Sequence, residues 1–234
     1  MDPGCVRSPF VVHRHHWWST GMRRITWSLL GDAHGRLLDV GCGPGWDLAE
    51  QPAGVWGIGL DQRWDRRVQM LARADPFVQA DAGMLPFRTA SFDLVLALDL
   101  LEQQELNPET VLREIRRVLR PGGRLLVRVP AHPWLYGPHD RDCGGARRYR
   151  KAELTALIRG TGFSICRLTY ANSIIFPLAA MIRFGGRAGL LRDDLPWLQR
   201  PFGGILLAVL DSEARWLRER DLPVGLSLVC LAEA

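Results

Sequence analysis

A glycine-rich turn after a short apolar segment constrains the fold of this chain more than any other feature. The segment Arg36–Glu50 reads RLLDVGCGPGWDLAE, and its apolar start is typical of a strand buried on both faces. Gly41, Gly43 and Gly45 permit positive φ angles and leave no Cβ atoms to keep a ligand off the backbone. The segment therefore predicts a strand, a ligand-binding turn and the start of a helix, which must be short because a proline follows at position 52.

Acidic residues stand at the ends of the predicted strands. Asp39 lies inside an apolar strand end, where a carboxylate must be paired or must hold something. Asp61 ends a second apolar strand, Val55–Leu60, and is placed to accept hydrogen bonds from a ribose diol. Asp81 follows a third strand, Phe77–Ala80, where it is placed for the exocyclic amine of adenine or caps a turn. These features describe a nucleoside-binding α/β half-domain.

Strand and helix patterns alternate to the end of the chain. Ser91–Leu98 (SFDLVLAL) predicts a fourth buried strand, and Asp99 follows at the strand end where ligands bind in open α/β sheets. Further helices are predicted over residues 13–30, 62–72, 107–119, 151–160 and 202–218, and further strands over residues 124–129, 163–170 and 226–231. The alternation predicts an α/β fold with one central sheet.

A long polar loop, Pro130–Arg150, leaves the end of the fifth strand (PAHPWLYGPHDRDCGGARRYR). Loops of this length inside a compact domain are usually functional, and this one points into the ligand crevice. Near the start of the chain, the adjacent residues Trp17 and Trp18 are expected to cover either the core or the entrance to a ligand site. We favour a lid over the ligand. The nearby histidines lack acidic or cysteine partners, so no metal site is expected.

Composition narrows the possible partners. The 234 residues suit one domain, and the net charge of +5 permits an anionic partner. The arginines occur as scattered pairs, which are typical of solvated helix faces, so no nucleic acid partner is expected. Five cysteines without CxxC spacing indicate reduced thiols and a cytoplasmic setting. No signal peptide is expected, and the longest apolar run, Ile174–Ile182, is too short to cross a bilayer.

Taken in order, five motifs resemble those of class I S-adenosylmethionine-dependent methyltransferases, in particular the type-11 group: DVGCGPG, GIGLD, DAGMLPF, SFDLVLALDLLEQ and LREIRRVLRPGGRLLVRVP. The match is close over Arg36–Val129. HHWWSTGMRR and the HPWLYGPHD loop are similar to a bacterial branch with little-known acceptors. The resemblance implies a doubly wound, Rossmann-like, seven-stranded sheet with an antiparallel last strand. Residues 1–31 would form a tail and capping helix, and residues 32–234 the methyltransferase domain, with cap helices inserted over residues 173–221.

The resemblance also implies S-adenosyl-L-methionine as cofactor and S-adenosyl-L-homocysteine as product. Asp39 and the turn residues Gly41, Cys42, Gly43 and Gly45 would surround the methionine part. Toward the nucleoside, Asp61 would bind the ribose, and Gln62, Asp81 and Ala82 would meet the adenine; Leu98 and Asp99 would line the sulfonium side. One position departs from the family: Gln103 stands where relatives commonly have histidine, so no role of that histidine can be transferred.

Methyl transfer from a sulfonium is a direct displacement in which the protein mainly aligns the reactants and excludes water. A hydroxyl acceptor needs a base, for which His139, next to Asp140, is the first candidate and His132 the second. Two further candidates, Tyr149 and Arg148, are expected to orient the acceptor, and Asp99 to face the sulfonium. The expected acceptor is a planar or apolar small molecule that contacts aromatic residues, namely Trp17, Trp18, Trp134 and Tyr136.

We expect O- or N-methylation of a small molecule in specialised-metabolite biosynthesis; lipid, quinone and glycan precursors remain alternatives. A nicotinamide dehydrogenase is disfavoured because Trp46 occupies the place of the third glycine in G-x-G-x-x-G. A non-catalytic scaffold is the second alternative, since Ile174–Ile182 with Arg183, Arg187 and Arg192 could lie on a bilayer. A substrate cap or the face of a homodimer is the favoured interpretation of that segment.

Overall fold

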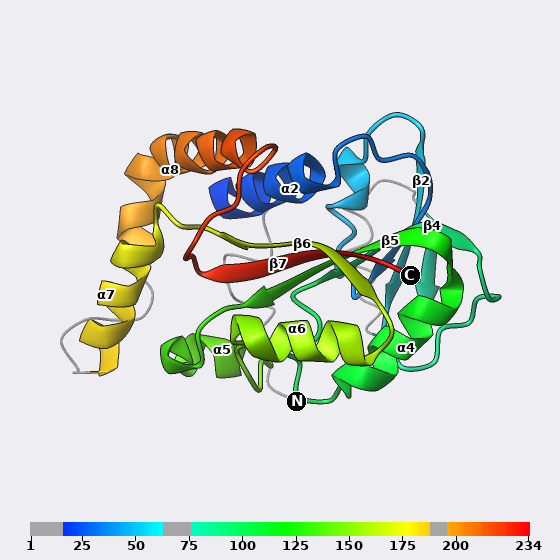
Figure 1. Cartoon of the computed structure of the whole chain (residues 1–234). Coiled ribbons are helices and arrows are strands. Elements are labelled where there is room, and N and C mark those ends of the chain that lie inside the picture. Colours follow the sequence, from blue (N-terminus) through cyan, green and yellow to red (C-terminus); the bar gives the residue numbers. More distant parts are fainter. Residues whose placement is uncertain (1–15, 63–75, 188–195) are drawn as a thin grey trace.

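The computed structural model describes residues 16–62, 76–187 and 196–234. Its centre is a seven-stranded sheet in the order β3-β2-β1-β4-β5-β7-β6 (Figure 1). The strands are β1 (Gly35–Val40), β2 (Val55–Asp61), β3 (Phe77–Gln79), β4 (Phe92–Leu98), β5 (Leu119–Pro130), β6 (Ser164–Ala171) and β7 (Ser227–Glu233). Strand β7 pairs antiparallel with both β5 and β6, whereas the pairs among the first five strands are parallel. This confirms the predicted fold class.

Helices cover the sheet on both faces (Figure 1). On one face lie α2 (Trp17–Leu30) and α8 (Pro196–Trp216), whose buried side chains pack with one side of the strands. On the other lie α4 (Pro108–Val118) and α6 (Lys151–Gly160), which share the larger apolar cluster with the opposite side. The short elements are η2 (Leu48–Glu50), η3 (Pro133–Leu135) and α5 (Pro138–Asp142), and α7 (Phe176–Arg187) stands at the left edge of the view.

Local sequence signals explain where these elements begin. The side chain of Asn107 caps α4 by accepting hydrogen bonds from the amides of Glu109 and Thr110. Pro108 occupies the first turn of the same helix, where a missing N–H costs nothing. The helix after the glycine turn is a single 3-10 turn, as the proline at position 52 predicts. The predicted helix over residues 62–72 lies outside the described residues after position 62.

Several predicted boundaries differ from the structure. Helix α8 begins at Pro196, ahead of the predicted start at residue 202. Strand β5 begins at Leu119, ahead of the Pro-Gly-Gly turn, because Leu119 pairs with Phe92 before a register shift. The loop over residues 130–150 contains η3 and α5, and a proline lies in the first turn of each. These short helices fix the loop after β5 beside the carboxyl ends of β4, β5 and β6. In the described part of the chain, no helix is both long enough and apolar enough to span a bilayer.

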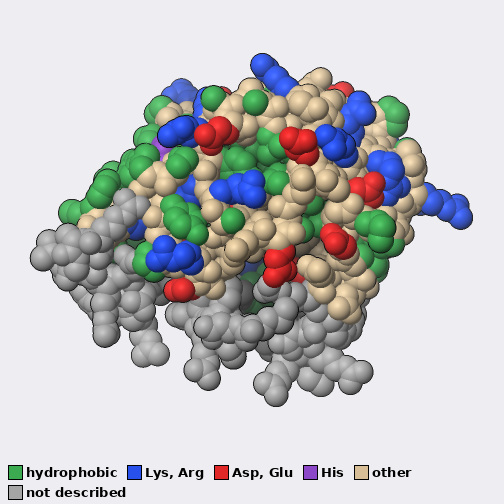
Figure 2. Space-filling view, turned by 90° about the horizontal axis from the view of Figure 1, so that it is seen from below, with side chains coloured by type: hydrophobic (Ala, Val, Ile, Leu, Met, Phe, Trp, Pro, Cys, Tyr) green, Lys and Arg blue, Asp and Glu red, His purple; other side chains and the backbone are tan. Residues whose placement is uncertain are grey.

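Charged side chains of both signs are interspersed on the face that carries α4 and α6, seen from below in Figure 2. Hydrophobic side chains gather at the left edge of that view, on the side where α7 lies in Figure 1. The exposed apolar residues of this side include Ile174, Leu178, Met181 and Phe184. The surface next to the carboxyl edge of the sheet is therefore more apolar than the surface over α4 and α6.

Candidate active site

The glycine turn lies between the carboxyl ends of β1 and β2 and is tied to β2 by backbone hydrogen bonds. The amides of Gly41 and Cys42 both donate to the carbonyl oxygen of Leu60, at 2.7 and 3.0 Å. The amide of Gly43 donates to Oδ2 of Asp61 at 2.9 Å. The predicted ribose-binding carboxylate therefore also fixes the turn, which brings the two halves of the predicted nucleoside site together.

The three glycines of the turn share one conformational requirement, and packing adds a second requirement at Gly41. All have positive φ, at +78° for Gly41, +50° for Gly43 and +75° for Gly45. A Cβ atom on Gly41 would lie 2.8 Å from the side chain of Leu100, so packing also demands a glycine there. Among the described residues, nothing lies within 4 Å of the Cβ positions of Gly43 and Gly45. The turn thus leaves open space on one side, where a bound molecule can approach the backbone.

Carboxyl groups gather around one buried arginine next to this turn. Arg128 of β5 is only 8% exposed and donates from Nε and Nη2 to Oδ2 of Asp99, at 3.0 and 2.6 Å. Burial raises the pKa of Asp39 well above its usual range, and the nearby Asp47 raises it further. Burial also raises the pKa of Asp47, although Arg128 opposes the shift. Oδ1 of Asp47 is buried and has no hydrogen-bond partner in the described chain.

A fourth carboxyl group, Glu102, completes the group around Arg128. Burial raises its pKa well above the ordinary value, and the negative charge of Asp99 adds to the shift. Arg128 faces Asp47, Asp99 and Glu102, and also acts on Asp39. The four carboxyl groups lie near Arg128, while Arg23 also acts on Asp47 and Arg148 also acts on Glu102. A cation bound here would relieve the excess of negative charge.

The residues present fit S-adenosylmethionine. Its ammonium and sulfonium groups are cations, and the acids around Arg128 match them in sign. The open glycine turn and Asp61 offer a backbone cradle and a carboxylate beside it. A dinucleotide would need a glycine where Trp46 lies, and Trp46 is a buried residue, 8% exposed. The donor set therefore favours a cationic nucleoside over a nicotinamide cofactor.

The remaining predicted cofactor residues lie along the same edge of the sheet. Oδ1 of Asp81 accepts a hydrogen bond from the amide of Gly83 at 2.7 Å, so this carboxylate shapes the turn after β3. Ala82 and Leu98 are buried, while the carbonyl oxygen of Gln62 accepts a bond from Gln79. Cys42 lies against Gly59 of β2, where its sulfur would be 2.7 Å from an added Cβ. Cys42 therefore packs against the strand, and the adenine assignments remain predictions.

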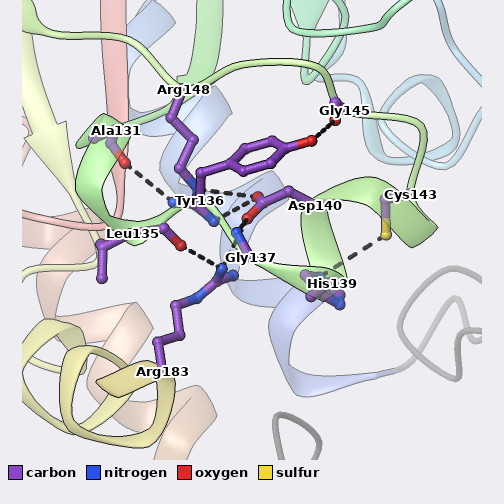
Figure 3. Close-up of polar contacts among 10 residues, drawn as sticks. All are labelled: Ala131, Leu135, Tyr136, Gly137, His139, Asp140, Cys143, Gly145, Arg148 and Arg183. Carbon is purple, nitrogen blue, oxygen red and sulfur yellow. Dashed lines mark hydrogen bonds and ion pairs between the residues drawn. The ribbon is translucent and has the colours of Figure 1, made fainter. Parts of the chain in front are cut away.

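The first candidate base, His139, does not form the expected pair with Asp140 (Figure 3). Asp140 instead accepts hydrogen bonds from Arg148 at 3.0 and 2.7 Å, from Arg183 at 2.9 Å and from the amide of Gly137 at 2.8 Å. Burial by itself would raise the pKa of Asp140, but the hydrogen bonds and charges of the two arginines hold it below its ordinary value. His139 lies on the far side of α5, with Nε2 3.9 Å from the sulfur of Cys143. Asp140 is therefore the partner of two arginines, and the role of His139 as a base remains a prediction.

The residues expected to orient the acceptor have structural partners. Arg148 is buried between Asp140 and the carbonyl oxygen of Ala131, to which it donates at 3.1 Å (Figure 3). Tyr149 is also buried, and its hydroxyl donates to the carbonyl oxygen of Leu101 at 2.7 Å. Because these donors are engaged inside the protein, we no longer assign Arg148 and Tyr149 to the acceptor. Tyr136 similarly donates to the carbonyl oxygen of Gly145 at 3.0 Å.

The second candidate base, His132, lies in an aromatic cluster at the carboxyl edge of the sheet. Its ring stacks on Tyr170 of β6 at 5.4 Å and 7°, and it contacts Phe176 and Trp134. Trp134 in turn stacks on Phe184 of α7 at 5.4 Å and is 44% exposed. We call these five residues the aromatic cluster. It joins the loop after β5, the end of β6 and α7.

His132 has unusual geometry within this cluster. Its φ is +62°, which is costly for a residue that is not glycine and is often found at functional sites. Its Nε2 is buried without a hydrogen-bond partner in the described chain. Burial lowers its pKa, which favours the neutral ring that a base requires. The structure therefore favours His132 over His139 as the histidine of the acceptor side.

Sequence reasoning missed Tyr170, Phe176 and Phe184. Tyr170 lies near the end of a predicted strand. Ligand contacts at strand ends are predicted mainly for acidic residues, so an aromatic residue there gave no signal. Phe176 and Phe184 are eight residues apart, which places them close to one face of α7. That spacing could have been found, but nothing local indicates that Trp134 is their partner.

The paired tryptophans of α2 pack toward α8. Trp17 and Trp18 are partly buried against the core cluster that α2 and α8 share, with ring centroids 5.7 Å apart. The ring of Trp17 lies 3.6 Å from the Cβ position of Gly203. Core packing thus accounts for both residues, and a lid over the cofactor is no longer needed to explain them.

The comparisons with known proteins agree with this geometry. Residues 38–127 match the family model of the methyltransferase domain, type 11. Residues 38–127 therefore form a methyltransferase domain of this family. It is 39% identical over 172 residues to an O-methyltransferase, cnsE, of Penicillium expansum, across 64% of this chain and 59% of that protein. The matched family segment runs from β1 to the middle of β5 and so contains the glycine turn and the acids at the ends of β2 and β4.

Other relatives differ in their named substrates. The chain is 40% identical over 104 residues to 27-O-demethylrifamycin SV methyltransferase of Amycolatopsis mediterranei, across 39% of this chain and 37% of that one. It is 36% identical over 129 residues to demethylmenaquinone methyltransferase of Lactococcus lactis, across 48% of this chain and 49% of that one. The chain thus spans about half or less of the length of most curated relatives it matches.

The fold is also found in solved structures. Burkholderia thailandensis 1,6-didemethyltoxoflavin-N1-methyltransferase, solved with its acceptor and S-adenosylhomocysteine, superimposes with a TM-score of 0.57 at 22% identity. The alignment covers 98% of this chain and 87% of that structure. At this identity the likeness shows the fold alone. It extends over the whole sheet, beyond the segment that matches the family model.

Proposed function

We propose that this chain transfers a methyl group from S-adenosylmethionine to an oxygen or nitrogen atom of a small apolar or planar molecule. The observation that carries the proposal is the open glycine turn beside an acid-rich, buried group of side chains. The turn offers space and backbone amides, and the acids match a cation. The family match supports the same cofactor independently.

The reaction would rest mainly on alignment. The bound cofactor supplies an electrophilic methyl group whose leaving group is a neutral thioether. Gly43 and Gly45 would let it approach the backbone, and Asp61 would hold its ribose. The carboxylates around Arg128 would stabilise its positive charge before transfer. Exclusion of water by the loop after β5 would protect the reaction.

The acceptor side is proposed from the aromatic cluster. Trp134 and Phe184 expose stacked aromatic surface at the same edge of the sheet as Asp99. A planar acceptor can stack on such rings, and a neutral His132 can accept a proton from its hydroxyl. Small-molecule O-methyltransferases among the relatives support an acceptor of this class.

The test is methyl transfer from isotope-labelled S-adenosylmethionine to three panels of acceptors: phenols and polycyclic hydroxy compounds, quinols, and aliphatic amines. We expect label in the phenolic panel and a kcat/KM about tenfold lower when Trp134 is replaced. Transfer to quinols alone would support the alternative acceptor class. Absence of transfer together with absence of cofactor binding would contradict the proposal.

A cytoplasmic setting and a homodimer also remain proposals. The described cysteines, Cys42, Cys143, Cys166 and Cys230, are free thiols, which supports a reducing compartment. The exposed apolar side chains of α7 support either an acceptor cap or a contact between subunits. Sedimentation at several concentrations, with and without S-adenosylhomocysteine, would separate these two uses of the surface.

A further inference from the structure

Two acids beside the glycine turn, Asp47 and Glu102, each have a carboxylate oxygen without a hydrogen-bond partner in the described chain, and Glu102 is the more deeply buried of the two. The residue is 94% buried, being 6% exposed, and the unpartnered atom is Oε2. Buried polar atoms are almost always hydrogen-bonded, so an exception calls for a physical role. Asp99, three residues earlier, is half exposed at its side chain and already bound to Arg128.

The backbone around Glu102 is fixed on both sides. Tyr149 donates to the carbonyl oxygen of Leu101, and the amide of Ala146 donates to the carbonyl oxygen of Glu102 itself, at 2.8 Å. The amide of Asp99 donates to the carbonyl oxygen of Arg128 at 2.9 Å, and Asp99 has a positive φ of +52°. The unpartnered carboxyl group is therefore held in place by its neighbours, so it is not simply a loose side chain.

Three charged groups face Glu102. Asp99 lies at the end of β4, Arg128 comes from β5 and Arg148 from the loop after β5. Both arginines have other carboxylates as hydrogen-bonded partners, Arg128 with Asp99 and Arg148 with Asp140. No ion pair with Glu102 is formed among the described residues. An added positive charge in the crevice would be the missing counter-charge.

We propose, on the basis of the proposed function, that Glu102 is a buried counter-charge for the cofactor, and that the positive charge of the cofactor sets whether Glu102 holds a proton. Without a cation in the crevice, Glu102 holds a proton. The positive charge of the sulfonium cofactor drives that proton off and leaves a carboxylate. After transfer the thioether product is neutral, and the carboxylate is free to take a proton again.

The step balances in atoms and charge. The S–CH₃ bond breaks with its electron pair left on sulfur, a bond forms between the methyl carbon and the acceptor atom, and the acceptor's proton leaves through His132. One proton returns to Glu102 once the sulfonium charge is gone. A sulfonium and a carboxylate are thereby replaced by a thioether and a carboxylic acid, so the buried site carries the same net charge before and after. Asp99 is bound to Arg128 and its side chain is half exposed, and its negative charge acts on Glu102.

The test measures proton linkage in binding, apart from turnover. S-adenosylmethionine and S-adenosylhomocysteine differ by the sulfonium charge, so protons linked to their shared ammonium group cancel in the comparison. Calorimetric titrations of the full chain in buffers of different ionisation enthalpy, from about pH 6 to about pH 9, give the protons released with each ligand. We expect the binding of S-adenosylmethionine to release up to about one proton more than the binding of S-adenosylhomocysteine. The ratio of the two affinities should then rise with pH, by up to about tenfold per pH unit, in favour of S-adenosylmethionine.

Glu102→Gln should remove this difference, and Glu102→Asp should restore it in part. Glu105→Gln is the matched control, because Glu105 is an exposed residue of the same loop, and it should keep the full difference. Equal proton release for the two ligands in the unaltered protein, or an unchanged difference in a folded Glu102→Gln variant, would overturn the inference. Failure of both ligands to bind would instead contradict the proposed function.

Discussion

Two groups of buried carboxylates at the same edge of the sheet have opposite electrostatic environments. On the cofactor side, Asp39, Asp47 and Glu102 have raised pKa values, first because of burial. On the side of the loop after β5, Asp140 has a lowered pKa, because hydrogen bonds and charges from Arg148 and Arg183 outweigh its burial. Asp140 forms ion pairs with two arginines, whereas Asp39, Asp47 and Glu102 form none among the described residues and can still bind a cation. The direction of the pKa shift thus distinguishes an acid with a structural role, Asp140, from the acids that we expect to bind a ligand.

The Asp140 side should show the largest effect on stability. Asp140→Ala leaves the buried guanidinium of Arg148 without its partner, which should lower the free energy of unfolding by about 3–5 kcal/mol. Urea denaturation measures the change. Asp142→Ala, on the exposed surface of the same helix, is the control and should stay within about 0.5 kcal/mol. Equal stabilities of the two variants would remove the assigned structural role of Asp140.

The cofactor side should instead show its effect in binding. Gly43→Val places a side chain in the open space beside the turn and should weaken S-adenosylhomocysteine binding by about 100-fold or more, ~2.7 kcal/mol. Gly54→Val is the control, since Gly54 also has a positive φ, of +88°, and open space, but lies at the start of β2. Both variants suffer similar backbone strain, so only the first should lose binding in calorimetric titrations. Equal losses would mean that strain alone explains the effect.

The aromatic cluster allows a smaller and more selective test. Trp134→Ala should reduce kcat/KM for the acceptor by about tenfold through lost stacking, while the affinity for S-adenosylhomocysteine changes less than about twofold. Trp216→Ala is a matched control, because Trp216 is similarly exposed, at 49%, but lies at the end of α8. A loss of cofactor affinity in the first variant would show that the two sides are not separate.

The pH dependence should differ in sign between the two sides. A raised carboxyl pKa means that the folded protein binds more protons than the unfolded chain, so the cofactor-side acids reduce stability as pH rises through their folded pKa values. The lowered pKa of Asp140 contributes stability that is lost as pH falls through its folded pKa. Thermal melting from about pH 5 to about pH 8 should therefore show stabilisation by S-adenosylmethionine that increases with pH. A pH-independent shift would contradict this assignment of charge.

The cofactor side could be predicted from the sequence better than the side of the loop after β5, and the reason is physical. The cofactor side depends on local signals: glycines at alternate positions and Asp61 at a strand end, which parallel strands bring together at one edge. The seven-stranded sheet and the antiparallel β7 followed from the family resemblance and are confirmed. The Arg128–Asp99 pair joins residues 29 positions apart, and a buried arginine in a strand has no distinct local pattern.

The loop after β5 could be placed, but its contacts could not. His139 was chosen because it adjoins Asp140, yet Asp140 is bound by Arg148, 8 positions away, and Arg183, 43 positions away. Closeness in sequence does not determine which charged side chain forms the ion pair with a carboxylate in a folded loop. The aromatic cluster likewise depends on how α7 packs against η3, which residue periodicity does not determine.

The central claim is that the crevice above β1 and β2 binds a cationic nucleoside cofactor. Calorimetric titration of the chain with S-adenosylmethionine and, separately, with NAD⁺ tests it most directly. We expect one S-adenosylmethionine to bind per chain and NAD⁺ to produce no binding heat. Binding of NAD⁺ in preference, or absence of S-adenosylmethionine binding in a folded sample, would contradict the account.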